Sequence, residues 1–415
     1  MIRRRSPARD LSLNPDVEER GLRRFPGFVL VSVLIVSVYA VPSGIGRETA
    51  ETARLQDQPQ LLEYSVATLA PMDVTVPPIV LENGSLHAML VDLAAGSSRS
   101  EVSTRLGIAG EELEALYRLI EMEGLGMQEA GGGWKPLALA LEYDSVDRLA
   151  VTAAPLAIVI ADMLEENWAA LDSTVSRLPV TGRLPLSQSG HILIGDYLLG
   201  LFQAEAFWEA GLAPPFRKYS FRVYRMNPGD APSGHVVTYT GHRGWRIVRY
   251  SPSGEVFGLA ALTDPGSPIS RALLGGAEPD TAARVAGEII DAYRLWYLMD
   301  TPPDPPTRRI LRRLEAADGQ GRLRIPIITQ DDLDRMRSIA WWMGEALWEH
   351  LQALLPEIGS IAVELGYGDP EMLGEVTLAV WEMAVHEAVW DLVGRGLLLP
   401  PIRRRSQALV VRVRQ

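Results

Sequence analysis

The chain has 415 residues, of which 47% are hydrophobic and 22% charged, and its net charge at pH 7 is −12. The length suggests two to three domains, and the composition is ordinary for a protein with a hydrophobic core. The negative charge argues against a protein whose whole surface coats nucleic acid. The lack of cysteine excludes disulfides, cysteine-ligated metal centres and cysteine nucleophiles.

The N-terminal region has the pattern of a signal peptide or a membrane anchor. A basic segment, residues 1–24, carries seven arginines and precedes the uncharged segment 25–46. The densest apolar part of that segment is about as long as a signal-peptide core and short for a spanning helix. By the positive-inside rule the N-terminus stays in the cytoplasm, so we expect a body that is membrane-anchored or exported. If translation starts at Met72, the body is cytoplasmic. Residues 47–84 are interpreted as a linker.

Residues 85–140 have a familiar order of elements. Helical patterns cover 86–95, 98–106 and 111–123, with Ser98 as a helix cap and Gly107 as a stop. Two strand-like pieces, 125–129 and 134–141, follow and are joined by three glycines. Three helices followed by a glycine-tipped hairpin resemble the winged helix-turn-helix domains of bacterial regulators. The resemblance covers about 55 residues and implies a fold more strongly than it implies a function.

The third helix of this winged-helix domain is the one that would enter a DNA groove. It carries Glu111, Glu112, Glu114, Glu121 and Glu123 against a single Arg118. A duplex repels such a surface, because affinity comes mainly from neutralised phosphates. The domain is therefore expected either to serve a protein partner or to be a purely structural module, and not to read DNA.

A second feature is an apparent internal duplication. An apolar strand-like run followed by Asp-x-x-Asp-Arg occurs twice, at Asp144–Arg148 and at Asp331–Arg335. Each copy then continues through helical sequence to a Gly-Leu…Pro-Pro mark, at Gly211 and at Gly396. The sequence predicts two copies of one helical unit, 141–216 and 325–402, packed on each other as a pseudo-symmetric pair. A basic tail, 403–415, follows the second copy.

The segment between the copies begins with β-type runs. Residues 217–264 are expected to form an antiparallel meander, because short strands alternate there with Gly- and Pro-containing turns. The meander is basic and rich in aromatic residues, which suits single-stranded nucleic acid or another anion. A sheet with its arginines merely in solvent is the plainer interpretation. The candidate anion-binding residues here are Arg222, Arg225, Arg243, Arg246 and Arg249.

Residues 265–324 contain a helix and a degenerate winged-helix-like segment. Its last helix carries four arginines, Arg308, Arg309, Arg312 and Arg313. These are candidate phosphate contacts, and the alternative is a solvated basic face or one paired with an acidic protein.

Catalytic and metal signatures are weak throughout. Two pairs have ligand-like spacing, His191 with Asp196 and Glu382 with His386, but neither has a third ligand. No nucleophile elbow or phosphate loop occurs, so we predict no catalytic residue, no metal and no cofactor.

The sequence thus predicts an α+β protein, mainly α, made of a winged helix, a duplicated helical unit and a β meander. The leading functional hypothesis is a non-catalytic regulatory or sensor protein that binds a protein partner or small ligand through its helical units. The alternative is a DNA-binding transcription regulator that uses the Arg308–Arg313 helix or the meander. A body outside the membrane excludes that alternative, because it cannot reach chromosomal DNA.

Overall fold

The computed structural model describes residues 64–71, 76–77, 79–80, 83–178, 185–201, 203, 206, 219–225, 237–240, 245–250, 279–313, 316–323, 327–399 and 411–413. The chain divides into two compact units, 1–51 and 52–415, and every described residue belongs to the second. The hydrophobic segment 25–46 and the alternative start at Met72 lie outside the described residues. Within the described part, no helix is long and apolar enough to cross a membrane.

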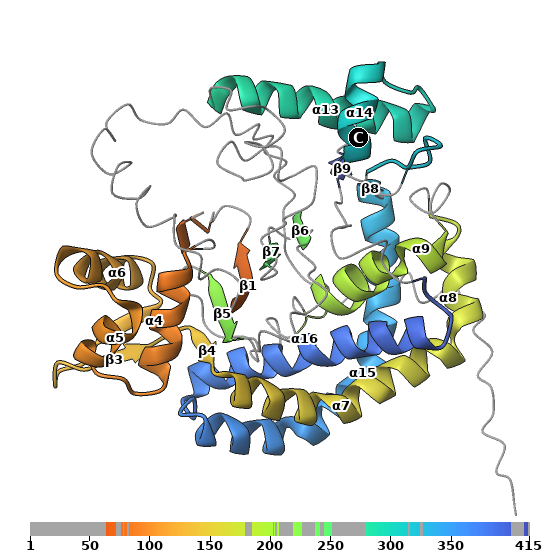
Figure 1. Cartoon of the computed structure of the whole chain (residues 1–415). Helices are drawn as coiled ribbons and strands as arrows, with labels where there is room; N and C mark the ends of the chain where they lie inside the picture. The colour runs from red at the N-terminus through yellow and green to blue at the C-terminus, as the bar shows by residue number, and fades with distance from the viewer. Residues whose placement is uncertain are drawn as a thin grey trace, which may run out of the picture. The chain divides into compact units, whose positions relative to one another are not determined.

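The fold is α+β and mainly helical, as the sequence predicts (Figure 1). The first elements are β1 (Tyr64–Pro71), α4 (Gly84–Ala94), α5 (Arg99–Leu106), α6 (Glu111–Met122), β2 (Gly126–Gln128), β3 (Trp134–Pro136), β4 (Leu139–Leu141), α7 (Tyr143–Glu166) and α8 (Trp168–Val175). They are followed by α9 (Leu186–Gly190), the π-helix η3 (His191–Leu201), β5 (Ser220–Arg225), β6 (Val237–Thr240), β7 (Trp245–Tyr250), α13 (Pro279–Met299), α14 (Pro305–Arg313), β8 (Ile327–Thr329), α15 (Gln330–Glu364), α16 (Pro370–Gly394) and β9 (Val411–Val413).

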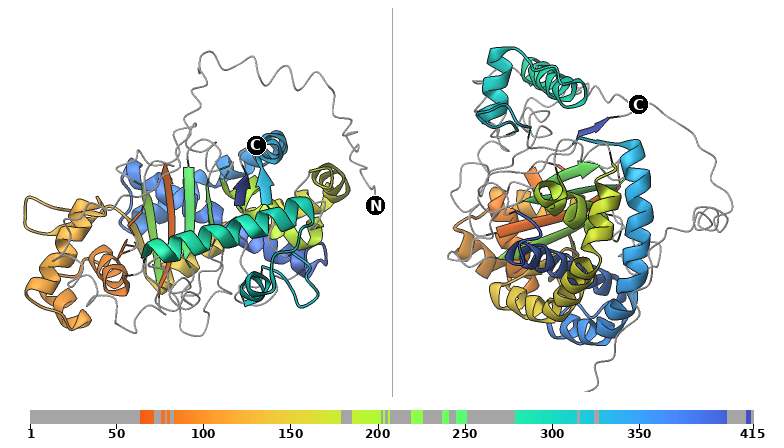
Figure 2. Two further views of the ribbon diagram at one scale, coloured as in Figure 1. Left: turned by 90° about the horizontal axis from the view of Figure 1, so that it is seen from above. Right: turned by 90° about the vertical axis from the view of Figure 1, so that its right-hand side faces the viewer.

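The main sheet has five strands in the order β4-β5-β1-β7-β6, with β1 antiparallel to both of its neighbours (Figure 2). This order corrects two predictions. Residues 64–71 are the central strand and not part of a linker. The strands of 217–264 do not form a meander of their own, because β1 is inserted between β5 and β7. Strand formation depends on pairing and burial more than on local propensity, so an eight-residue strand far from its partners leaves little local signal.

The strands β4 and β5 bury side chains on both faces of the sheet. Tyr64, Val66, Phe221 and Val223 lie in a core that also contains α4, α5 and α6. Residues that alternate with them along the strands, such as Leu139, Leu141 and Tyr224, lie in a second core built by the long helices. A polar residue on either face of β5 therefore points into packed protein.

The three helices and the hairpin predicted for residues 85–140 are present, but the predicted strand piece 134–141 is divided into β3 of the hairpin and β4 of the main sheet. Helices α4, α5 and α6 precede the antiparallel hairpin β2–β3. Ser98 begins α5 through a capping box with Glu101, and Gly107 ends it at φ 67°. Leu113, Leu116, Tyr117 and Ile120 form the buried side of α6. The resemblance to the winged helix-turn-helix family stays a prediction.

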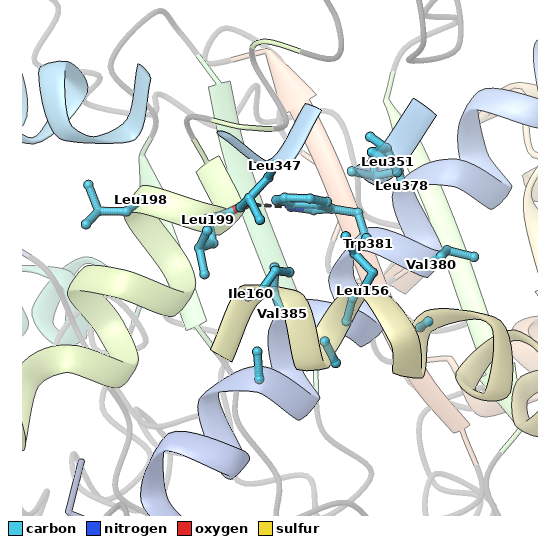
Figure 3. Packing of buried hydrophobic residues seen from close by; sticks show 14 of the residues in the cluster. Leu156, Ile160, Leu198, Leu199, Leu347, Leu351, Leu378, Val380, Trp381 and Val385 are labelled. Carbon is cyan, nitrogen blue, oxygen red and sulfur yellow. Dashed lines mark hydrogen bonds between the residues drawn. The ribbon is translucent and has the colours of Figure 1, made fainter. Parts of the chain in front are cut away.

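The larger core joins both predicted helical units. It takes residues from α7, η3, α15 and α16, and Trp381 of α16 is one of its largest fully buried side chains. Figure 3 shows this indole among Leu156, Leu347 and Leu351, with its Nε1 donating to the carbonyl of Leu199 at 2.7 Å. Gln203 donates to the neighbouring carbonyl of Leu198 and to that of Ala340. A side chain of α16 and one that lies just beyond the π-helix thus satisfy carbonyls at its end.

The two proposed copies have comparable beginnings. Each starts as a short strand that leads directly into a long helix, β4 into α7 and β8 into α15. Asp144 and Asp331, which begin the two Asp-x-x-Asp-Arg patterns, are the second residues of these helices.

The helices of the two proposed copies also pack on one another. α7 packs on α16 of the second copy, and α15 packs on η3 of the first. The first helices differ in length, 24 residues in α7 and 35 in α15. That the two segments 141–216 and 325–402 are copies of one unit stays a prediction.

Helices α13 and α14 pack on each other, and a turn follows α14. Residues Ala317 and Leu323 close that turn by a β-bridge, and Trp296 of α13 lies under it at Gly321. Further along the chain, β8 pairs in parallel with β9. Part of the predicted basic tail is therefore a strand.

Candidate binding surfaces

Arg222 is not on a solvent-facing surface, and this prediction is wrong. Its side chain has no exposed area and lies between β5 and α16. The guanidinium forms ion pairs of 2.9 Å with both Glu375 and Glu382, and it also donates to Ser220. The physical reason is that α16 covers the face of β5 on which Arg222 falls by strand alternation.

The charges around Arg222 form a buried network. Burial raises the pKa of Glu375, although Arg222 and Ser220 act against that rise. Burial alone would lower the pKa of Arg222, but the carboxylates outweigh this effect and raise it. The guanidinium Nε and the hydroxyl of Tyr224 are buried without a hydrogen bond. We interpret the network as the polar connection that fixes α16 to the sheet.

The other arginines that were predicted to form an anion site in the meander do not form a common surface among the described residues. Arg225 is partly exposed and pairs with Glu142 at 3.2 Å. Arg246 and Arg249 lie on β7, opposite Ala70 and Ala67, and their side chains are outside the description. Arg243 lies outside the described residues altogether. The arginines whose side chains are described therefore form no shared cationic surface on this sheet.

The arginines of α14 have a different environment. Arg309, Arg312 and Arg313 are exposed and Arg308 is partly exposed. None of the four forms an ion pair with a residue that the structure describes. At about 100° per residue they share one arc of about 140° around the helix. The predicted basic helix is thus present, and its cationic face is accessible.

The exposed face of α7 carries a surface that was not predicted. Val151, Ala154, Pro155 and Ile158 are all exposed, the valine by 73% and the isoleucine by 56%. Their spacing of i, i+3, i+4 and i+7 places them on one side of the helix, opposite the buried Leu156. We call these four residues the α7 stripe. Apolar composition alone could not reveal it, since sequence does not show which side of an apolar helix is covered.

Acidic residues lie at both ends of the α7 stripe. Asp144 and Asp147 precede it on the same face, and Asp162 and Glu165 follow it. Arg395 pairs with both of the following acids, with Asp162 at 2.8 Å. Arg395 also pairs with Asp391, so one positive charge is shared among three carboxylates. The net charge at this end of the stripe therefore remains negative.

Of the residues considered as metal ligands, two form other contacts and two have side chains that the structure does not describe. Glu382 pairs with Arg222, and His386 accepts from Trp390 at 3.2 Å. His191 and Asp196 lie in η3, where their side chains are not described. Among the described residues, no group of three or more His, Asp or Glu side chains could hold a metal ion.

Comparison with known proteins gives no family for this chain. No family model, no curated protein and no solved structure matches it. Functional inference therefore rests on the surfaces described above.

Proposed function

We propose that this protein is a regulatory binding protein that takes up a protein partner on the α7 stripe, within the first helical unit. The observation that carries the proposal is the exposure of Val151 and Ile158 on a helix whose opposite side is already packed in the core. A helix at a protein surface normally turns polar residues to solvent, and a contiguous apolar patch marks an interaction site. The proposal assigns the chain no catalytic role.

The surroundings of the stripe define the chemistry of the partner. Asp147 and Asp162 are 15 residues apart, which corresponds to about 22 Å along a helix. A partner helix of about four turns, with an apolar side and with lysine or arginine at both ends, complements this surface. Pro155 has no N–H, so the carbonyl of Val151 lacks its helical donor and adds an acceptor within the stripe.

Residues 85–140 and the N-terminal segment have secondary roles in this proposal. The winged-helix-like region 85–140 serves as a protein-facing or structural module, since Glu114 and Glu121 are exposed on α6. The export pattern of residues 25–46 predicts a body that lies outside the cytoplasm or on a membrane anchor, whereas a start at Met72 predicts a cytoplasmic body. The mature N-terminus, read by mass spectrometry after cell fractionation, tests that placement.

A synthetic peptide tests the α7 surface directly. The probe is an amphipathic helix of about 18 residues with leucines at i, i+3, i+4 and i+7 and two lysines at each end. Its fluorescence anisotropy with the full chain should report binding that weakens at least about tenfold in Val151→Ser/Ile158→Ser. Val363→Ser is the matched control, because Val363 is 66% exposed on another helix.

Three results decide between the possible occupants. A peptide with glutamates in place of the lysines should not bind, and equal binding of both peptides would contradict the charge complementarity. Equal affinities for the stripe variant and the Val363→Ser control would overturn the site itself. If sedimentation shows a dimer that the stripe variant dissociates, the occupant is a second copy of this chain and the proposed partner is wrong.

A further inference from the structure

Helix α14 presents a surface that the α7 proposal does not use. Its four arginines occupy one side, and Leu311, with no exposed area, anchors the other side in the protein. The exposed large apolar residues of this region, Leu295, Leu298 and Met299, lie on α13, and α14 itself has none. The accessible face of α14 is therefore cationic from Arg308 to Arg313.

The helix is held firmly at its N-terminus. Asp304 accepts from the backbone N–H of Thr307 at 3.0 Å and from its hydroxyl at 2.7 Å, and Pro305 and Pro306 begin the helix. This is the capping arrangement expected of a stable helix start.

The turn after α14 is also ordered by local contacts. Asp318 accepts from the backbone N–H groups of Gln320 and Arg322, and it pairs with the Arg322 side chain at 2.6 Å. Arg322 is thereby paired within the turn, so among the described residues from 300 to 323 the arginines without an ion pair are those of α14.

We infer that α14 is a binding site for duplex nucleic acid, held through its phosphates. Arginine is the side chain best suited to phosphate, because its planar guanidinium donates two parallel hydrogen bonds. A protein interface normally has an apolar centre, which this face lacks. An α-helix with its side chains is about 10–12 Å in diameter and fits a major groove that is about 12 Å wide.

The order of elements supports the same inference. α14 is the second helix of a helix–turn–helix pair and is followed by a closed turn, which is the position of a groove-binding helix and its wing. α6 holds the corresponding position in residues 85–140, but its exposed face is acidic. The exposed face of α6 is therefore negatively charged and that of α14 positively charged, and of these two helices only α14 is suited to bind phosphate.

The test compares two triple variants of the full chain that remove the same charge. Arg309→Ala/Arg312→Ala/Arg313→Ala removes the exposed α14 cations, and Arg99→Ala/Arg118→Ala/Arg148→Ala removes three arginines from α5, α6 and α7. A fluorescent duplex of about 20 base pairs is titrated at several salt concentrations. The wild type should bind with an affinity that falls linearly on a log–log plot against salt.

The α14 variant should bind at least about tenfold more weakly at low salt, with a salt slope smaller by about 0.9 for each phosphate that is no longer neutralised. The control variant and the triple Arg→Lys variant at the same α14 positions should bind nearly as the wild type does. Circular dichroism verifies the fold of every variant. Equal reductions of affinity in both alanine variants, or binding to heparin without binding to the duplex, would overturn the inference. Loss of duplex binding in the α7 stripe variant would contradict the independence of the two sites.

Discussion

Arg222 and Glu375 form an ion pair of 2.9 Å in which both side chains are almost entirely buried. Glu375 lies 153 residues further along the chain, so the pair joins β5 of the sheet to a helix that is distant in the sequence. Two charges removed from water are tolerated only when they remain paired and hydrogen-bonded. The pair therefore makes the packing of α16 on β5 sensitive to the removal of either partner.

The first prediction concerns this pair. Arg222→Met should lower the free energy of unfolding by about 3–5 kcal/mol, because two glutamates are left buried without their cation. Arg222→Met/Glu375→Gln/Glu382→Gln should recover a large part of that stability, measured by urea denaturation. Arg225→Met is the control, and a partly exposed pair of this kind contributes only about 0–1 kcal/mol. Equal destabilisation by Arg222→Met and Arg225→Met would contradict the buried network.

A second prediction concerns a buried histidine. His87 is fully buried beside Tyr64 and Phe221, and its Nε2 lies 2.8 Å from the carbonyl of Val80. Burial lowers its pKa from 6.5 to about 4, with the Val80 hydrogen bond acting in the opposite direction. The unfolded chain therefore binds a proton between pH 6.5 and 4 that the folded chain does not. Stability supplied by the neutral imidazole is present above pH 6.5 and decreases as the pH falls.

The contribution of His87 to the free energy of unfolding should decrease by about 2 kcal/mol from about pH 7 to about pH 5. His87→Gln should remove this part of the pH dependence, as seen in urea denaturation at the two pH values. His350→Gln, at an exposed position on α15, serves as the control. A pH dependence unchanged in His87→Gln would show that other groups cause the decrease of stability in acid.

A third prediction concerns an edge of the sheet. The hydroxyl of Tyr367 donates to the carbonyl of Ala140 at 2.7 Å and accepts from its N–H at 3.0 Å. One phenol thus serves both backbone groups of a residue in β4, as a neighbouring strand would. Tyr367→Phe should cost about 1–3 kcal/mol, because it leaves both groups buried and unpaired.

Tyr117 offers the matched control for this prediction, since its buried hydroxyl has no hydrogen-bond partner among the described residues. Tyr117→Phe should leave the free energy of unfolding unchanged or raise it slightly. The interpretation of Tyr367 fails if the two phenylalanine variants have the same stability.

The local elements could be predicted from sequence because their signals are local. The cap at Ser98, the stop at Gly107 and the aspartates at the starts of α7 and α15 each depend on a few adjacent residues. Helix α14 is predictable in the same way, from its arginines and prolines.

The burial of Arg222 could not be predicted in this way. Arginine is rarely buried completely, and the carboxylates that permit it come from a distant helix. Its one visible signal is on α16, where Glu375 and Glu382 stand seven residues apart in an apolar run and so share a face. The central position of strand β1 and the exposure of the α7 stripe could not be predicted for the same reason. Tertiary contacts alone determine which elements lie beside them.

The final prediction concerns two glycines of α15. A Cβ on Gly344 would lie 2.5 Å from Oε1 of Gln203, and the donor group of that amide is already bound to the carbonyls of Leu198 and Ala340. Gln203 cannot move without breaking both bonds, so Gly344→Ala should be destabilising by about 1–3 kcal/mol despite the better helix propensity of alanine. A Cβ on Gly359 would meet nothing within 4 Å, and Gly359→Ala should stabilise the protein by about 0.5–1 kcal/mol. Thermal unfolding of the two variants should therefore shift in opposite directions, and a gain in both would show that Gln203 adapts without cost.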